Sequence, residues 1–113
     1  MLTKEQILST PTPKLTPIPV PEWGGEVCVK VMSGTERDAW EAVAFEDGHV
    51  TKDQFRAKLL VQTLSDEDGN LLFTPADIAA LNEQASPVLI RLGDIALEVN
   101  ALNAKDVDKL TKN

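Results

Sequence analysis

The sequence predicts an α+β fold that is mainly helical. A proline-rich arm and a β-hairpin are expected over residues 1–32, and a bundle-like core of four to five helices with a polar C-terminal tail over residues 33–113. Three observations predict this arrangement: a long apolar helix near the end of the chain, an alternating strand pattern after a glycine turn, and repeated helix-start signals. A chain of 113 residues is long enough to bury one core, so we expect a single domain.

The longest predicted helix runs from Ser86 to Leu102. Ser86 is a good N-cap, and Pro87 suits the first helical position because its missing N–H costs nothing there. Apolar residues then recur at spacings of three and four: Val88, Leu92, Ile95, Val99 and Leu102. Leu89 and Ala96 widen this face. We expect it to lie in the core, covered by the other helices.

The N-terminal arm combines a helix signal with a proline-rich segment. Thr3 to Gln6 has the spacing of a capping box and predicts a short helix that ends before Pro11. Five prolines between Ser9 and Pro21 then rule out a regular helix, so this segment is expected to be extended and, within a sheet, to lie at an edge.

A β-hairpin is predicted around the turn Glu22-Trp23-Gly24-Gly25. The segment from Leu15 to Val20 is expected to pair with the segment from Glu26 to Met32. Period-two alternation places three valines on one face of the second strand: Val27, Val29 and Val31. A two-stranded hairpin is rarely stable alone, so this face needs a helix or a second copy of the chain against it.

Three further helices are predicted from their start signals. Ser33 to Glu36 forms a capping box for a helix to about Glu46, Thr51 is expected to cap a helix to Leu64, and Thr74-Pro75 starts a third. The expected inward residues of the three helices are, in order, Ala39, Trp40, Val43 and Ala44; Phe55, Leu59, Leu60, Thr63 and Leu64; and Ile78, Leu81 and Ala85. Asn103 is expected to cap a last turn.

Composition argues against several classes of function. A net charge of −7 argues against sequence-independent binding to nucleic acid, which requires clustered lysines and arginines. No apolar run has the length of a membrane span. The single Cys28 favours a reducing compartment, and the N-terminus lacks the apolar core of a signal peptide, so we expect a cytoplasmic protein.

No catalytic, cofactor or metal site is predicted. Cys28 and His49 are the only cysteine and the only histidine in the sequence, and two residues are too few to form a zinc site. A hydrolase that uses Cys28 and His49 as a catalytic pair is the weakest alternative, because a cysteine in a strand is not placed to form a thiolate. The alternation of Asp66, Asp68 and Asn70 resembles the start of an EF-hand loop, but the glycine and the final glutamate fall at the wrong positions.

Trp23 at the hairpin tip has two readings. A large ring beside two glycines is a frequent hot spot for binding, so Trp23 and the valine face of Val27, Val29 and Val31 form the predicted partner-binding surface. The alternative is that Trp23 folds back onto its own domain. Trp40, on the inner face of its helix, is expected to be core.

Four short motifs in fixed order resemble the small tail assembly chaperones of long-tailed bacteriophages and prophages. They are P-E-W-G-G-E-V from Pro21, S-G-T-E-R-D-A-W-E from Ser33, D-E-D-G-N-L-L-F from Asp66 and T-P-A-D-I-A-A-L from Thr74. The resemblance runs from about Thr3 to Leu102.

The resemblance implies a non-enzymatic role in the host bacterial cytoplasm. Such chaperones bind the helical tape measure protein, deliver tail tube subunits to it, tend to self-associate and are absent from the finished virion. Many also have a longer, frameshifted product. The alternative is a structural tail-completion or head–tail connector protein, in which the same hairpin and helices would join subunits of the virion.

Overall fold

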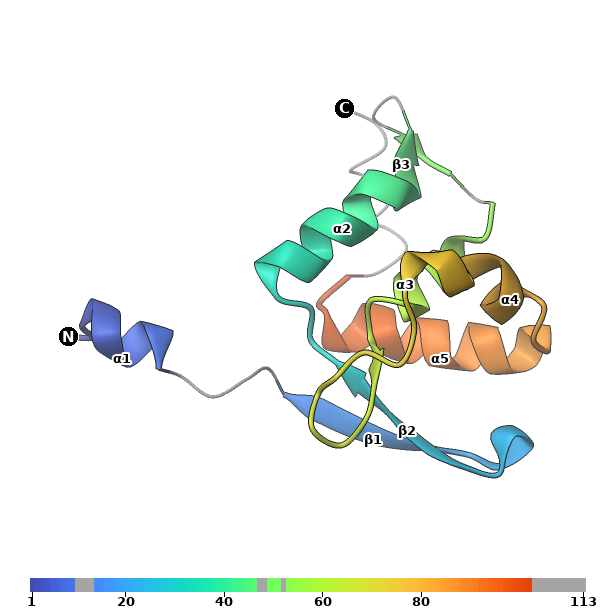
Figure 1. The fold of residues 1–113 in the computed structure, drawn as a ribbon, viewed down its shortest axis with the longest axis horizontal. Coiled ribbons are helices and arrows are strands. Elements are labelled where there is room, and N and C mark those ends of the chain that lie inside the picture. Colours follow the sequence, from blue (N-terminus) through green and yellow to red (C-terminus); the bar gives the residue numbers. More distant parts are fainter. Residues whose placement is uncertain (10–13, 47–48, 52, 103–113) are drawn as a thin grey trace.

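The hairpin and the helices together form the mixed α+β fold, mainly helical, that the sequence predicts. The structure is a computed structural model that describes residues 1–9, 14–46, 49–51 and 53–102. Figure 1 shows the helices on one side of the hairpin, with the short helix α1 (Lys4–Leu8) standing apart at the N-terminal end. The remaining elements, in chain order, are β1 (Leu15–Val20), η1 (Pro21–Trp23), β2 (Gly25–Lys30), α2 (Gly34–Ala44), β3 (Phe45–Glu46), β4 (His49–Val50), α3 (Phe55–Leu60), β5 (Leu64–Ser65), η2 (Pro75–Asp77), α4 (Ile78–Asn82) and α5 (Ser86–Val99).

The predicted hairpin is confirmed, with a third strand added. β1 pairs antiparallel with β2 from Leu15↔Lys30 to Val20↔Gly25, and the order β1-β2-β5 leaves the proline-containing β1 at the edge. Gly24 follows η1 with a φ of 77°, a left-handed conformation that glycine adopts without steric cost. β5 adds two residues to the other side of β2, at Cys28↔Ser65 and Val29↔Leu64.

Helix α5 is the centre of the core, as its apolar stripe predicts. Val88, Leu89, Leu92 and Ala96 are buried, whereas Ile95 and Val99 are partly buried against the core. The helix contacts both β2 and α3. Gly93 permits the approach of α3, because a Cβ at this position would lie 3.3 Å from Cγ of Arg56. Leu102, after the end of the helix, is also buried.

Helix α2 begins at its predicted capping box and packs through a narrow face. The Ser33 hydroxyl accepts from the N–H of Glu36 at 3.2 Å, and the Glu36 carboxylate accepts from the N–H of Ser33 at 2.9 Å. Trp40 and Ala44, four residues apart, are the buried pair; Val43 is partly buried. Ala39, predicted to face inward, is exposed because it flanks this face. The helix ends at Ala44 rather than near Glu46.

The segment between α2 and α3 differs most from its prediction. Thr51 does not cap a helix: its N–H and its hydroxyl both donate to the carbonyl of Ala44, at 2.8 and 3.2 Å. It thereby extends the short β3–β4 pairing, and α3 begins only at Phe55, after Gln54 in a left-handed conformation. Residues 47 and 48 of the predicted break lie outside the described residues.

Three other helix boundaries also move. The predicted helix to Leu64 ends at Leu60, because Leu64 joins the sheet as β5. Helix α4 ends at Asn82, and the exposed Ala85 becomes the N-cap of α5, so Ser86 is the first helical residue and not the cap. The expected cap at Asn103 lies outside the described residues.

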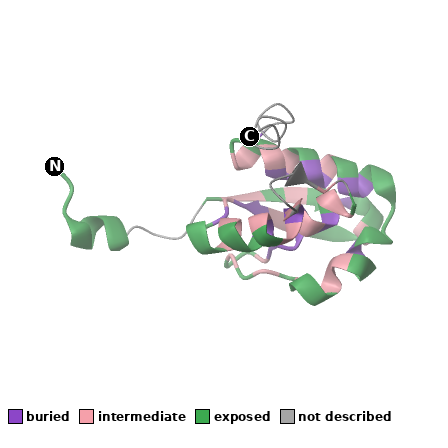
Figure 2. Ribbon diagram, turned by 90° about the horizontal axis from the view of Figure 1, so that it is seen from above, coloured by how far each residue is buried: buried purple, intermediate pink, exposed green. Residues whose placement is uncertain are grey.

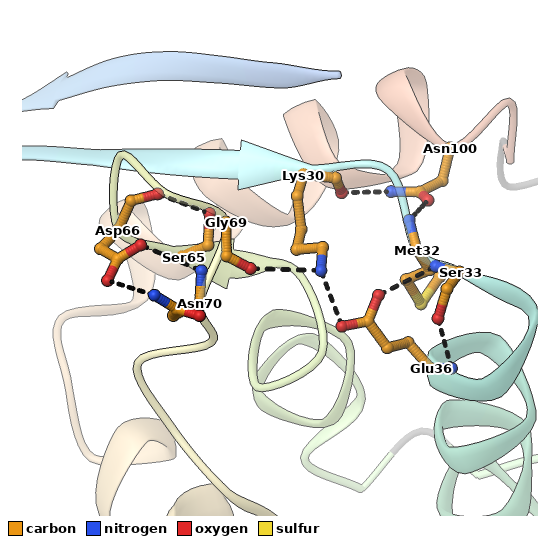
Figure 3. A network of polar contacts seen from close by, with 9 residues as sticks. All are labelled: Lys30, Met32, Ser33, Glu36, Ser65, Asp66, Gly69, Asn70 and Asn100. Atoms are coloured by element: carbon orange, nitrogen blue, oxygen red, sulfur yellow. Dashed lines mark hydrogen bonds and ion pairs between the residues drawn. The ribbon is translucent and has the colours of Figure 1, made fainter. Parts of the chain in front are cut away.

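A polar junction joins the end of β2 to the start of α2 and the end of α5 (Figure 3). The buried Lys30 at the end of β2 donates from Nζ to Oε2 of Glu36 at 2.8 Å and to the carbonyl of Gly69 at 3.3 Å. Asn100, just after α5, accepts from the N–H of Met32 at 2.7 Å and donates to the carbonyl of Lys30 at 3.3 Å. The side chains of Lys30 and Asn100 therefore each hydrogen-bond to a residue from another part of the fold.

Candidate functional site

The hairpin tip is fastened to the helices by two polar contacts. Trp23 is partly buried, and its indole Nε1 donates to Oε1 of Gln84 at 3.2 Å. The guanidinium of Arg91 on α5 pairs with both carboxylate oxygens of Glu22, at 2.7 and 3.0 Å. The hydrogen bond from Arg91 lowers the pKa of Glu22 to about 2. The tip therefore folds back onto its own domain, as the second reading of Trp23 predicts.

A shallow groove remains between the tip and α4. Its volume is 280 Å³, and its lining comes from η1, the segment from Phe73 to the end of η2, α4 and the residues just after α4: Trp23, Phe73, Asp77, Ala80, Leu81 and Gln84. Leu81 is buried and Ala80 is exposed, so the first lies at the base and the second at the rim. Trp23 thus covers part of the domain and also presents part of its ring to the groove.

The sequence singled out only one residue of this groove as a binding residue. Phe73, Asp77 and Gln84 were not predicted, because they lie 50 to 61 positions from Trp23 in the chain. In the sequence, Asp77 stood out only as part of the helix-start signal at Thr74-Pro75. The structure shows the matching contact, because the Asp77 carboxylate accepts from the N–H of Thr74 at 2.8 Å. Nothing in the local sequence marks Gln84.

The predicted valine face is divided between the core and the surface. Val29 has no exposed surface and contacts the core under α5, so a partner cannot reach it in this conformation. Val27 and Val31 are partly buried. The predicted surface of Trp23 and the three valines is therefore not accessible at every residue.

The arm helix α1 is a second exposed apolar region. It has no buried residue, and Figure 2 shows it entirely exposed and separate from the domain. Met1, Leu2, Ile7 and Leu8 are all exposed large hydrophobic residues. The reciprocal capping box of Thr3 and Gln6 is formed as predicted.

Cys28 lies on the central strand β2 in a setting that disfavours a thiolate. Burial, followed by the nearby carboxylates of Glu26 and Asp66, raises the pKa of its thiol. A hollow of 300 Å³ beside it is lined partly by these carboxylates. His49 pairs in β4 with Glu46, on a different sheet. The strand placements put Cys28 and His49 in separate sheets and do not support a nucleophile–base pair.

The loop from Asp66 to Asn70 is a turn held by its own side chain. The Asp66 carboxylate accepts from the backbone N–H groups of Asn70 and Asp68, at 2.9 and 2.8 Å, and the Asn70 bond contributes most to lowering its pKa. Within the described ranges, no group of three or more His, Cys, Asp or Glu residues is placed to hold a metal ion. Among the same residues, no helix is long and apolar enough to cross a membrane.

Comparison with known proteins places these features in a family. Residues 13–112 match the sequence profile of the family described as phage tail assembly chaperone. No curated protein matches the chain. Among solved structures, the chain resembles the bacteriophage HK97 tail assembly chaperone, with a TM-score of 0.56 and 24% identity, over 76% of this chain and 84% of that one. The structural likeness supports the same fold. Because the profile covers nearly the whole chain, this protein belongs to the phage tail assembly chaperone family.

Proposed function

We propose that this chain binds the tape measure protein of its phage and helps to bring tail tube subunits to it during tail morphogenesis. The chain acts without catalysing a reaction, in the host bacterial cytoplasm, and is absent from the mature virion. The observation that carries the proposal is the family profile over residues 13–112. The resemblance of the four sequence motifs supplies the identity of the partners.

The surface of the domain supports a protein-binding role. The groove beside Trp23 is lined mainly by apolar side chains, and α1 presents further apolar residues to solvent. Apolar surface of this kind is typical of sites that bind another protein, and tryptophan is enriched among residues whose loss weakens binding most. Amphipathic helices are suitable ligands for such surfaces.

Co-expression tests the proposal directly. The tape measure protein encoded with this chain is expected to be insoluble alone, soluble when co-expressed, and retained on a tagged copy of the chain. Trp23→Ala is expected to weaken retention while leaving the far-ultraviolet circular dichroism spectrum unchanged. A tape measure protein that is fully soluble alone and forms no complex would contradict the proposal.

Mass spectrometry of purified phage particles separates the chaperone role from a structural one. A chaperone is expected to be missing from the particles, whereas a tail-completion or connector protein would be present in a fixed ratio to the tube protein. Detection of this chain in such a ratio would replace the chaperone proposal with the structural alternative.

A further inference from the structure

The groove beside Trp23 has the size of a side-chain pocket. Sites for small molecules usually enclose about 300 to 1,000 Å³ and bury most of the ligand. The groove measures 280 Å³ and lies open at the surface between η1 and α4. This volume suits one or two apolar side chains projecting from another protein, and it is small for a metabolite.

The charge of the lining restricts the occupant further. Asp77 is the only ionisable residue in the lining, and one of its oxygens, Oδ1, makes no hydrogen bond to any described residue. Glu22 at the hairpin tip is already paired with Arg91. The net charge presented by the lining is therefore negative, and it complements a lysine or arginine on the occupant.

The backbone at the nearby sheet edge argues for a helical occupant. An extended peptide would bind by adding a strand to β1, the edge strand. Pro17 and Pro19 in β1 have no N–H groups, so this edge lacks donors that an added strand needs. A helix satisfies its own backbone and needs only side-chain contacts, which the groove provides.

We propose that the groove receives an amphipathic helix that inserts one apolar side chain between Trp23 and Leu81 and places a lysine or arginine against Asp77. The two partner residues lie three or four positions apart, the spacing of neighbours on one helical face. Nε2 of Gln84, which has no partner among the described residues, donates to a polar group of the same helix. The inference rests on the proposed function, because it assigns this helix to the tape measure protein.

Filling the groove tests the apolar half of the inference. Ala80→Trp places a large ring at the rim, while Ala79→Trp adds the same ring to an adjacent exposed position of α4 that does not line the groove. The probe is the tape measure fragment that remains bound to the wild-type chain after limited proteolysis of the co-expressed complex. Ala80→Trp is expected to raise its Kd about tenfold or more, and Ala79→Trp less than about twofold. Thermal unfolding checks that both variants fold.

Removing the charge tests the polar half. Asp77→Asn keeps an oxygen that accepts from Thr74 but removes the negative charge, and Asp94→Asn removes an exposed charge on α5 away from the groove. Because exposed ion pairs are weak, Asp77→Asn is expected to raise the Kd about two- to fivefold and to flatten its salt dependence. Asp94→Asn is expected to change neither.

The outcomes separate this inference from the proposed function. If the wild-type chain retains no tape measure protein, the proposed function fails. If the wild-type chain binds and Ala80→Trp binds equally well, or if Ala79→Trp is impaired as strongly, the groove assignment is overturned and the function stands. If Ala80→Trp raises the Kd but Asp77→Asn leaves it unchanged, the proposed contact between Asp77 and a basic partner residue is overturned. The proposed apolar contact between Trp23 and Leu81 then stands.

Discussion

Helices α1 and α2 begin in the same way and lie in opposite environments. Each starts with a reciprocal capping box, Thr3 with Gln6 in α1 and Ser33 with Glu36 in α2. α1 has five residues, none of them buried. α2 has eleven, with Trp40 in the core. Figure 2 shows the contrast between the entirely exposed arm helix and the partly buried helices of the domain.

A capping box therefore sets the residue at which a helix starts, whereas packing against the core sets how much the helix contributes to the stability of the fold. An isolated helix shorter than about 12 residues is marginal in water because nucleation fixes several residues for one hydrogen bond. In α1, which has no buried residue, the capping box offsets part of this cost. In α2, the burial of an aromatic side chain adds several kcal/mol.

The largest expected contrast comes from truncating one apolar residue in each helix. Trp40 has no exposed surface and contacts the rings of Phe45 and Phe55 edge to face, with centroids 5.7 and 6.3 Å away. Trp40→Ala is therefore expected to lower the free energy of unfolding by about 3–5 kcal/mol. Leu8→Ala is expected to leave it unchanged. Urea unfolding of both variants measures the difference, and a comparable loss for Leu8→Ala would show that α1 packs on the domain.

The next contrast uses the third residue of each capping box. Glu36 caps α2 and also pairs with the buried Lys30, so Glu36→Ala leaves a buried cation without its partner. We expect a loss of about 2 kcal/mol in the free energy of unfolding. Gln6→Ala, the equivalent change in α1, removes the acceptor of the Thr3 N–H in a helix without a buried residue, and a smaller loss is expected. Equal losses of unfolding free energy in the two variants would contradict the view that tertiary contacts, and not the caps, make α2 contribute more to stability than α1.

The cap residues themselves give a smaller effect. Ser33→Ala removes the hydroxyl that accepts from the N–H of Glu36, and it is expected to cost about 1 kcal/mol in urea unfolding. Thr3→Ala removes the equivalent acceptor in α1. Its effect is expected only in the NMR chemical shifts of residues 4–8, which should move toward random-coil values. A shift in the urea midpoint for Thr3→Ala would overturn this.

The smallest effect is expected in the dependence of stability on pH. Burial alone raises the pKa of Glu36, but the hydrogen bonds from Lys30 and Ser33 outweigh it, and the net pKa lies below the ordinary 4.5. A carboxyl with a lowered pKa stabilises the fold above its unfolded-state pKa, and this stabilisation is lost as pH falls through the folded-state value. Stability should therefore decline below about pH 4.5, and less steeply in Glu36→Gln. Parallel curves for the two proteins would refute this role of Glu36.

Local chemistry predicts much of this fold. The caps of α1 and α2, the pairing of the two hairpin segments and the buried stripe of α5 all follow from residues close together in the sequence. These features depend on spacing and backbone geometry, which a short segment determines. Trp40 is buried in the core, as its place on the inner face of α2 predicts.

Features that depend on contacts between residues far apart in the chain could not be predicted from the sequence. The apolar run from Leu59 to Leu64 fits a helix by periodicity, yet its last residue pairs with Val29, 35 positions earlier. Thr51 has the composition of a cap but bonds to Ala44 instead. The groove needed Trp23 and Gln84 to meet across 61 positions, and no local pattern encodes that contact. The sequence therefore marked Trp23 as a candidate binding residue, and it could not indicate the residues that surround Trp23 in the structure.

The side chain of Asn100 joins the C-terminal end of α5 to the end of the sheet. By bonding to Lys30 and Met32, it fixes the last turn of α5 beside the junction of β2 and α2. The groove lies by α4, near the first residues of the same helix (Figure 1). The junction and the groove thus lie at opposite ends of α5, about 20 Å apart, which is the length of a 14-residue helix. A contact at the groove is therefore separated from the polar junction by the full length of the helix.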